Sequence, residues 1–238
     1  MSSNSNPWNG HKAAVSLTFD DGLDVQLNYA IPELDRRGIK ATFFLIAGQV
    51  LQSSRLKDWH TVLAAGHEIG SHSVDHLKIA DIDHIRISKE VHESKEMLEA
   101  EFKTPIVSYC YPYTHVNQFA RMCAVASYQQ ARGGRVARED KLIPLNSKPD
   151  LFNVPCYHIG SSVFENGELD GWLADLDKRS DLHPWLTLMF HGVGPDPTQW
   201  DNISSEQFSE LLDRLQKLDV WITTFAGAGA RFRRGHLG

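Results

Sequence analysis

The sequence predicts a single α/β domain built on a parallel sheet, because strand and helix patterns alternate along most of its 238 residues. Short apolar runs rich in β-branched and aromatic residues are separated by amphipathic segments that end at glycine or proline. The number of strands favours a barrel over an open sheet. The predicted strands cover residues 13–19, 40–46, 67–71, 106–109, 185–190 and 220–223.

The first half of the chain has the clearest alternation. The strand over 13–19 ends at an Asp-Asp-Gly sequence, and a helix over 25–37 follows and stops at a glycine, with Pro32 predicting a kink or a late start. A second helix over 54–65 also stops at a glycine. The longest helix covers 81–102 and ends before a proline.

The second half contains weaker signals. A helix is expected over 115–126 and another over 165–178, and the glycines, prolines and charges of 132–150 predict a long loop between them. The helix over 204–218 begins with a serine followed three residues later by glutamine, which is typical of a capping box. The basic segment 231–234 is expected to be a solvated end.

Composition excludes several classes of protein. A chain that is 42% hydrophobic and 10% aromatic is not disordered, and its apolar runs are too short to cross a membrane. Its 24 basic and 30 acidic residues disfavour a nucleic-acid surface. Three cysteines do not form a disulfide framework. Residues 1–11 are expected to be a polar tail and 12–238 the domain.

Polar residues follow four of the predicted strands directly, where functional groups gather in parallel α/β folds. These segments are Asp20-Asp21-Gly22, His72 to His76, Cys110 to Tyr113, and His191. Each alone has an ordinary interpretation: the aspartates as a turn or helix cap, His191 as a core histidine, and a His pair as a coincidence among twelve histidines. Together they occupy one rim of one predicted sheet.

The combination has a chemical meaning. Two histidines spaced i, i+4 and one carboxylate make a three-ligand metal site that leaves a position open for water. A second carboxylate beside it can take the proton from that water, and a histidine on another strand can protonate the leaving group.

These segments, in this order, resemble the polysaccharide deacetylase family, which shares the NodB-like homology domain and is also called carbohydrate esterase family 4. The resemblance is carried by Thr18 to Gly22, His72 to His76, Tyr111-Pro112-Tyr113 and Met189-Phe190-His191, and it spans residues 13–225. It implies a distorted (β/α)7 barrel and metal-dependent deacetylation of acetylated sugars.

The resemblance also implies a role for each matching residue. Asp20 would be the general base and His191 the catalytic acid. The ligands of one divalent metal, zinc in preference to cobalt or nickel, would be Asp21, His72 and His76. Tyr113 would offer its backbone N–H to the oxyanion, and Leu188 would line the pocket for the acetyl methyl group.

The chain departs from the family pattern in two places. Cys110 stands where the third motif usually has an arginine that orients the base, and Arg132 is the candidate replacement, with a solvated surface arginine as the alternative. The Asp-Trp pair of the fourth motif has no convincing match, since Asp170-Gly171-Trp172 lies in a predicted helix. Trp185 is expected to form a wall of the site instead. Trp200 is expected either to stack on a sugar ring or to seal a loop.

The leading hypothesis is therefore a metal-dependent hydrolase that removes acetyl groups, N-acetyl in preference, from a poly- or oligosaccharide. The alternatives are an O-acetyl esterase acting on a xylan-like polymer, a metal-independent hydrolase of C–N bonds in small amides, and a non-catalytic sugar-binding protein. The expected partner is an acetylated carbohydrate, with no nucleic acid and no membrane span. The family favours a secreted or periplasmic location, whereas the absence of a signal-peptide pattern at Met1 allows a cytoplasmic one.

Overall fold

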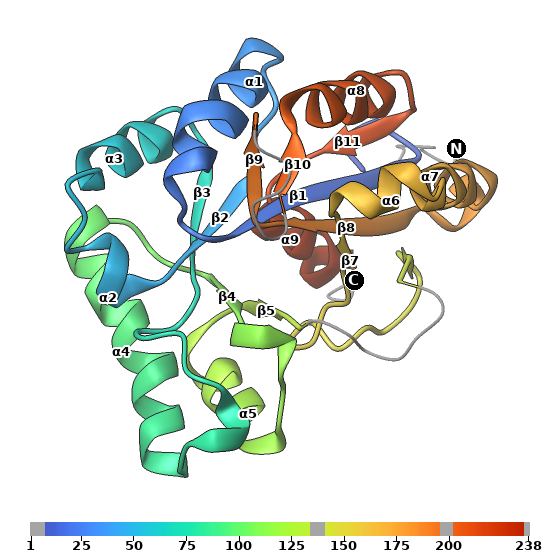
Figure 1. Cartoon of the computed structure of the whole chain (residues 1–238). Coiled ribbons are helices and arrows are strands. Elements are labelled where there is room, and N and C mark those ends of the chain that lie inside the picture. Colours follow the sequence, from blue (N-terminus) through green and yellow to red (C-terminus); the bar gives the residue numbers. More distant parts are fainter. Residues whose placement is uncertain (1–7, 134–140, 196–201, 236–238) are drawn as a thin grey trace.

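The computed structural model describes residues 8–133, 141–195 and 202–235. Within these residues, the strands form a curled, mainly parallel nine-stranded sheet in the order β5-β4-β3-β2-β1-β8-β6, with β11 beside β1 and β7 beside β8 (Figure 1). The strands are β1 Ala13–Asp21, β2 Thr42–Leu45, β3 Glu68–Ser71, β4 Ser108–Cys110, β5 Gln130–Arg132, β6 Ile143–Pro144, β7 Tyr157–His158, β8 Pro184–Phe190, β9 Gly192–Gly194, β10 Asn202–Ser204 and β11 Val220–Ile222.

The helices cover the outside of this sheet, except for the C-terminal helix, whose Phe225 packs against Trp185 on the interior face. The α-helices are α1 Ile31–Arg36, α2 Ala47–Val50, α3 Leu56–Ala64, α4 His84–Phe102, α5 Gln118–Ser127, α6 Ser161–Glu165, α7 Glu168–Lys178, α8 Ser205–Gln216 and α9 Phe225–Gly235. Four shorter helical turns are η1 Gln26–Ala30, η2 Ile79–Asp81, η3 Pro112–Thr114 and η4 Ser180–Leu182. Among the described residues, no helix combines the length and the apolar composition of a membrane span.

The distorted barrel expected from the sequence is confirmed. Its two sheet edges are joined by the segment 151–158, which first pairs with β5 and then forms β7 beside β8. Ala131 N–H donates to the Leu151 carbonyl at 2.8 Å, and Val154 N–H donates to the Ala131 carbonyl at 3.0 Å. These bonds satisfy the outer edge of β5, which would otherwise present unpaired backbone groups.

Strand β1 is central and buried on both faces. Val15, Leu17 and Phe19 pack in the main core toward the helices, where the Phe19 ring lies 5.0 Å from the Phe190 ring. The alternate residues face the barrel interior, where the Ser16 hydroxyl accepts a bond from the Trp185 indole at 3.1 Å. This alternation is the period-2 pattern of a strand, and it brings Asp20 to the interior at the carboxyl end.

The helix signals were also largely correct. The serine of the predicted capping box, Ser204, accepts a bond from Gln207 N–H, and the glutamine side chain accepts one from Ser204 N–H. Pro32 does not mark a late start, because the π-helical turn η1 runs directly into α1 and the helix continues without a break through Pro32. The wider π turn lies just before the proline, which cannot donate a backbone hydrogen bond.

Three parts of the prediction need correction. Residues 231–234 are not a solvated end, because they lie in α9 and Phe232 is buried. Trp8, in the segment expected to be a polar tail, is buried as well: it joins Phe232 and Trp185 in a second apolar cluster, where the Trp8 and Phe232 ring centroids lie 5.6 Å apart. The expected loop 132–150 contains the short strand β6, antiparallel to β8. The sequence did not predict β6 because a strand of two residues is too short to show an alternation of apolar and polar residues.

A buried histidine predicts one pH effect on stability. The His67 ring is fully buried, its Nδ1 accepts from Ala41 N–H at 3.2 Å, and its Nε2 lies 3.1 Å from Asp35 Oδ1. Burial lowers the pKa of His67 below its ordinary value, against the opposing hydrogen bond to Asp35. The unfolded chain therefore takes up the proton first, and stability is lost as the pH falls below about 6.5.

We expect the free energy of unfolding to fall more steeply in the wild type than in His67→Asn between about pH 7.5 and about pH 5.5. The asparagine oxygen can still accept from Ala41 N–H but does not titrate. Urea unfolding of both proteins at both pH values measures the difference. Parallel losses of stability would contradict the assignment.

Candidate active site

A cavity of about 790 Å³ lies at the carboxyl ends of the strands. It is lined mainly by histidines, aspartates and lysines that come from loops distant in the sequence. The described lining residues are Asp20, Asp21, His72, His76, Lys78, Tyr113, Thr114, His115, Lys141, Cys156, His158, Met189 and His191. The four segments singled out in the sequence therefore meet in one cavity.

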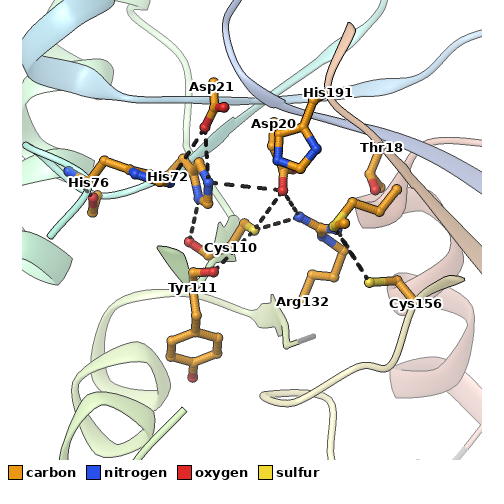
Figure 2. Close-up of polar contacts among 12 residues, drawn as sticks. Thr18, Asp20, Asp21, His72, His76, Cys110, Tyr111, Arg132, Cys156 and His191 are labelled. Carbon is orange, nitrogen blue, oxygen red and sulfur yellow. Dashed lines mark hydrogen bonds and ion pairs between the residues drawn. The ribbon is translucent and has the colours of Figure 1, made fainter. Parts of the chain in front are cut away.

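Asp21, His72 and His76 face one another at one side of the cavity (Figure 2). Nε2 of His72 lies 3.4 Å from Asp21 Oδ1, and Nε2 of His76 lies 3.5 Å from the same oxygen. Nδ1 of His72 lies 2.9 Å from the Cys110 carbonyl oxygen, which can only accept, so Nδ1 carries the proton and Nε2 carries the lone pair. Two ring nitrogens and a carboxylate oxygen thus converge on one point.

These three side chains fit a metal ion. Their ligand atoms all lie within 4.8 Å of one another, and Asp21 Oδ1 is buried without a hydrogen-bond partner among the described residues. A tetrahedral ion with bonds of about 2.0–2.2 Å places its ligands about 3.3–3.6 Å apart, close to the observed spacing. Burial and the neighbouring His72 lower the pKa of His76 to about 4, which keeps that imidazole neutral as a ligand must be.

Asp20 lies beside this group and is held by a cation. The Arg132 guanidinium on β5 donates to Asp20 Oδ2 and also contacts the Cys110 sulfur, as Figure 2 shows. Burial opposes ionisation of Asp20, but the charge and the hydrogen bond of Arg132 outweigh it and hold the pKa of Asp20 below its ordinary value. Both members of the Asp20–Arg132 pair are buried, so Arg132 is not a surface residue.

His191 and Tyr113 also line the cavity. His191 follows β8, and its ring lies 5.8 Å from the His158 ring. Tyr113 has a left-handed backbone with φ 54°, and its ring lies 4.5 Å from the His76 ring. No described residue accepts a hydrogen bond from Tyr113 N–H. This amide is therefore available to a ligand in the cavity.

Strained backbone is concentrated around the cavity. Of the eight described non-glycine residues with positive φ, five belong to the segments that form this site: Asp21, Ser73, His76, Tyr113 and Thr114. Residues with a Cβ occupy this region at a cost, and such residues cluster at functional sites.

Comparison with known proteins identifies the family. A family model for polysaccharide deacetylases matches residues 9–130, just over half of the chain. The chain belongs to the polysaccharide deacetylase family. The match includes the Asp20, Asp21, His72, His76 and Tyr113 segments, whereas His191 lies outside it.

The matches to individual relatives cover less than half the length of each relative. A peptidoglycan-N-acetylglucosamine deacetylase of Bacillus cereus is 31% identical over 94 residues, which are 39% of this chain and 43% of the relative. A chitin deacetylase of Pestalotiopsis is 38% identical over 80 residues, which are 32% of this chain and 26% of the relative. The chain thus spans less than half the length of these relatives.

Solved structures support the fold of this family member. The Xyl-CE4 domain of a multidomain xylanase from the hindgut metagenome of Trinervitermes trinervoides superposes with a TM-score of 0.65 at 19% identity, covering 94% of this chain and 91% of that chain. A Mycobacterium smegmatis protein, provisionally assigned as a polysaccharide deacetylase, superposes with a TM-score of 0.72 at 17% identity over 96% of this chain and 93% of that chain.

Two residues expected in this site lie elsewhere. Leu188 is buried in the main core on the helix-facing side of β8, and its neighbour Met189 lines the cavity instead. The reason is the strand alternation, which sends Met189 and His191 to the interior. Trp185 is also interior, but at the other end of β8, where it packs against Phe225. Trp200 lies outside the described residues.

Two supporting residues were not found in the sequence. Gln26 is fully buried, and its amide donates to the backbone carbonyls of Asp20 at 2.5 Å and His191 at 2.8 Å. Glu90 on α4 accepts from the N–H groups of Val74 and Asp75 at 3.0 and 2.8 Å. The one available signal concerned Glu90, a charged residue on the otherwise apolar face of a long helix.

Glu90→Ala should weaken metal binding about 10- to 100-fold, the range typical of contacts that hold a ligand in place. The 72–76 loop loses its acceptors, so His76 is no longer fixed beside Asp21. Zinc titration measures the effect, and Glu93→Ala on an exposed position of the same helix is the control. Equal zinc affinities in both variants would show that Glu90 does not order the loop.

Proposed function

We propose that this deacetylase-family chain is a metal-dependent hydrolase that removes acetyl groups, N-acetyl in preference, from an acetylated poly- or oligosaccharide. The observation that carries the proposal is the Asp21–His72–His76 group beside the buried Asp20–Arg132 pair. This arrangement supplies three metal ligands and a separate carboxylate in one cavity. A sugar-binding protein would need neither.

A divalent metal bound at Asp21, His72 and His76, with zinc as the first choice, would supply a Lewis acid that polarises water and the acetyl carbonyl. Asp20 accepts the proton of the attacking water. It can do so because its pKa lies below the ordinary range, so the carboxylate is ionised at neutral pH. Arg132 fixes the orientation of this carboxylate by its buried contact with Oδ2.

Two further residues of the cavity complete the chemistry. Tyr113 N–H donates to the oxyanion that forms when water adds to the acetyl carbonyl. His191 donates a proton to the departing amine or alcohol of the sugar. Gln26 donates to the backbone carbonyls of Asp20 and His191 at the ends of the neighbouring strands β1 and β8, and so keeps the two residues at a fixed separation.

Acetate release tests the proposal. The purified protein is incubated with N-acetylchitooligosaccharides, peptidoglycan, acetylated xylan and a small non-sugar amide, and free acetate and amine are measured. We expect release from N-acetylated saccharides above release from xylan. Hydrolysis of the amide alone, or saccharide binding without release, would overturn the proposal in favour of the C–N hydrolase or the sugar-binding protein.

Arg132→Met should lower kcat about 10²-fold, the size of loss expected when a reacting group is displaced by about 1 Å. Removing one partner of a buried ion pair also costs about 3–5 kcal/mol of stability, so thermal unfolding is measured alongside. Arg132→Lys keeps the charge but not the planar fork, and an intermediate kcat is expected. Bound metal should stay unchanged in both variants.

The surface variant Arg36→Met is the control, since that side chain is 66% exposed. A folded Arg132→Met or Arg132→Lys protein with wild-type kcat would show that Asp20 needs no arginine.

A further inference from the structure

The charge of the cavity wall is opposite to that of the whole chain. The protein has a net charge of −6, yet Lys78 and Lys141 both line the cavity. Asp20 and Asp21 are the only carboxylates among the described lining residues. Asp20 is neutralised by Arg132, and Asp21 faces two histidines (Figure 2). The part of the wall beyond the metal group is therefore positively charged.

Lys78 is placed next to the reacting end of the cavity. It follows the His76 loop, and its ammonium lies 5.2 Å from the centre of the Tyr113 ring, which is itself tilted against the His76 ring with centroids 4.5 Å apart. Cations within about 6 Å of an aromatic face are attracted to it, so the ring holds Lys78 near the amide that faces the acetyl group.

Lys141 is held in the same manner by another strand. Its ammonium lies 4.6 Å from the centre of the Tyr157 ring on β7. Tyr157 is itself stacked on Trp172 of α7, with ring centroids 4.1 Å apart. The lysine therefore sits on a fixed aromatic platform rather than at the end of a free surface chain.

Neither lysine has a carboxylate partner in the described part of the chain, whereas Lys40, Lys95 and Lys178 are each paired with one. Two lysine cations that line the same cavity as the metal ligands oppose the binding of a divalent cation there, because like charges repel. A neutral sugar would not compensate for this repulsion. A negatively charged group on the substrate would.

We propose that the substrate of this site carries a carboxylate on the sugar unit next to the acetylated one, as a uronic acid does. The inference rests on the proposed deacetylase function and deepens it. Lys78 and Lys141 bind that carboxylate and attract the anionic chain toward the cavity. Because the attraction is electrostatic, salt weakens it.

The test uses one saccharide in two forms. A tetrasaccharide that alternates N-acetylglucosamine with glucuronic acid is compared with the same molecule after its carboxylates have been reduced to alcohols. We expect kcat/KM for acetate release to be at least about tenfold higher for the acid form at low ionic strength, as steering of an anion predicts. The advantage should shrink as the salt concentration rises.

The double variant Lys78→Gln with Lys141→Gln should lower the ratio of the two kcat/KM values toward one, with metal bound at least as tightly as in the wild type. Lys178→Gln, at an exposed position on α7, is the control and should keep the wild-type ratio. An equal or higher kcat/KM for the reduced form in the wild type would overturn the carboxylate proposal and leave the deacetylase proposal intact. Absence of acetate release from both forms and from N-acetylchitooligosaccharides would overturn both.

Discussion

Asp20→Asn is expected to stop turnover while the metal stays bound. The asparagine amide oxygen can still accept from Arg132, so the buried pair keeps its shape, but the side chain can no longer take a proton from water. General acid–base steps contribute about 10²–10⁴-fold, and kcat should fall at least that far. Acetate release and metal content per chain are measured on the same preparation.

Asp21→Asn is the matched comparison, since it makes the same chemical change one residue along. Asp21 Oδ1 faces both His72 and His76, so this variant should lose metal as well as activity. If Asp20→Asn lost the metal and Asp21→Asn kept it, the base and the ligand would have to exchange places.

Removal of the metal should abolish activity, and zinc, cobalt or nickel should restore it. Metal that binds only the folded state also raises stability, by about 4 kcal/mol at a thousandfold excess over Kd. The thermal unfolding temperature of the chelated protein should therefore rise by several degrees on addition of zinc. This second readout does not depend on the choice of substrate.

His72→Ala is the control for that rise. It removes one ligand atom, and the shift in unfolding temperature with zinc should largely disappear. Full acetate release by a protein shown to contain no metal, or an equal zinc shift in His72→Ala, would contradict the ligand set.

The rim of the barrel was predictable because its residues follow strands that are easy to recognise. Asp20 and His191 come directly after strongly apolar runs, and the carboxyl ends of parallel strands meet at one edge. Arg132 could be named as a candidate for the same reason, since it ends a short apolar stretch. Its burial, however, follows from three-dimensional packing that no local pattern contains.

The contacts that support the site were beyond prediction for two physical reasons. Gln26 donates to backbone carbonyls 6 and 165 residues away in the chain. Every residue has such a carbonyl, so the sequence does not indicate which ones a side chain will reach. Leu188 and Met189 were confused because a shift of one residue exchanges the two faces of a strand. Resemblance to the family locates the strand but not which of two adjacent apolar residues points inward.

The apolar cluster that joins Trp8 to Phe232 has a consequence for biosynthesis. Its members come from both ends of the described chain, together with Trp185, so the cluster cannot form until residue 232 has left the ribosome. At a synthesis rate of about 5–20 residues per second, Trp8 remains without its packing partners for roughly 10–45 seconds after its own synthesis. The barrel therefore stays incomplete until nearly all of the described chain has been made, and for that interval the newly made first strand, which is buried along nearly its whole length in the folded protein, is a surface for chaperones to protect.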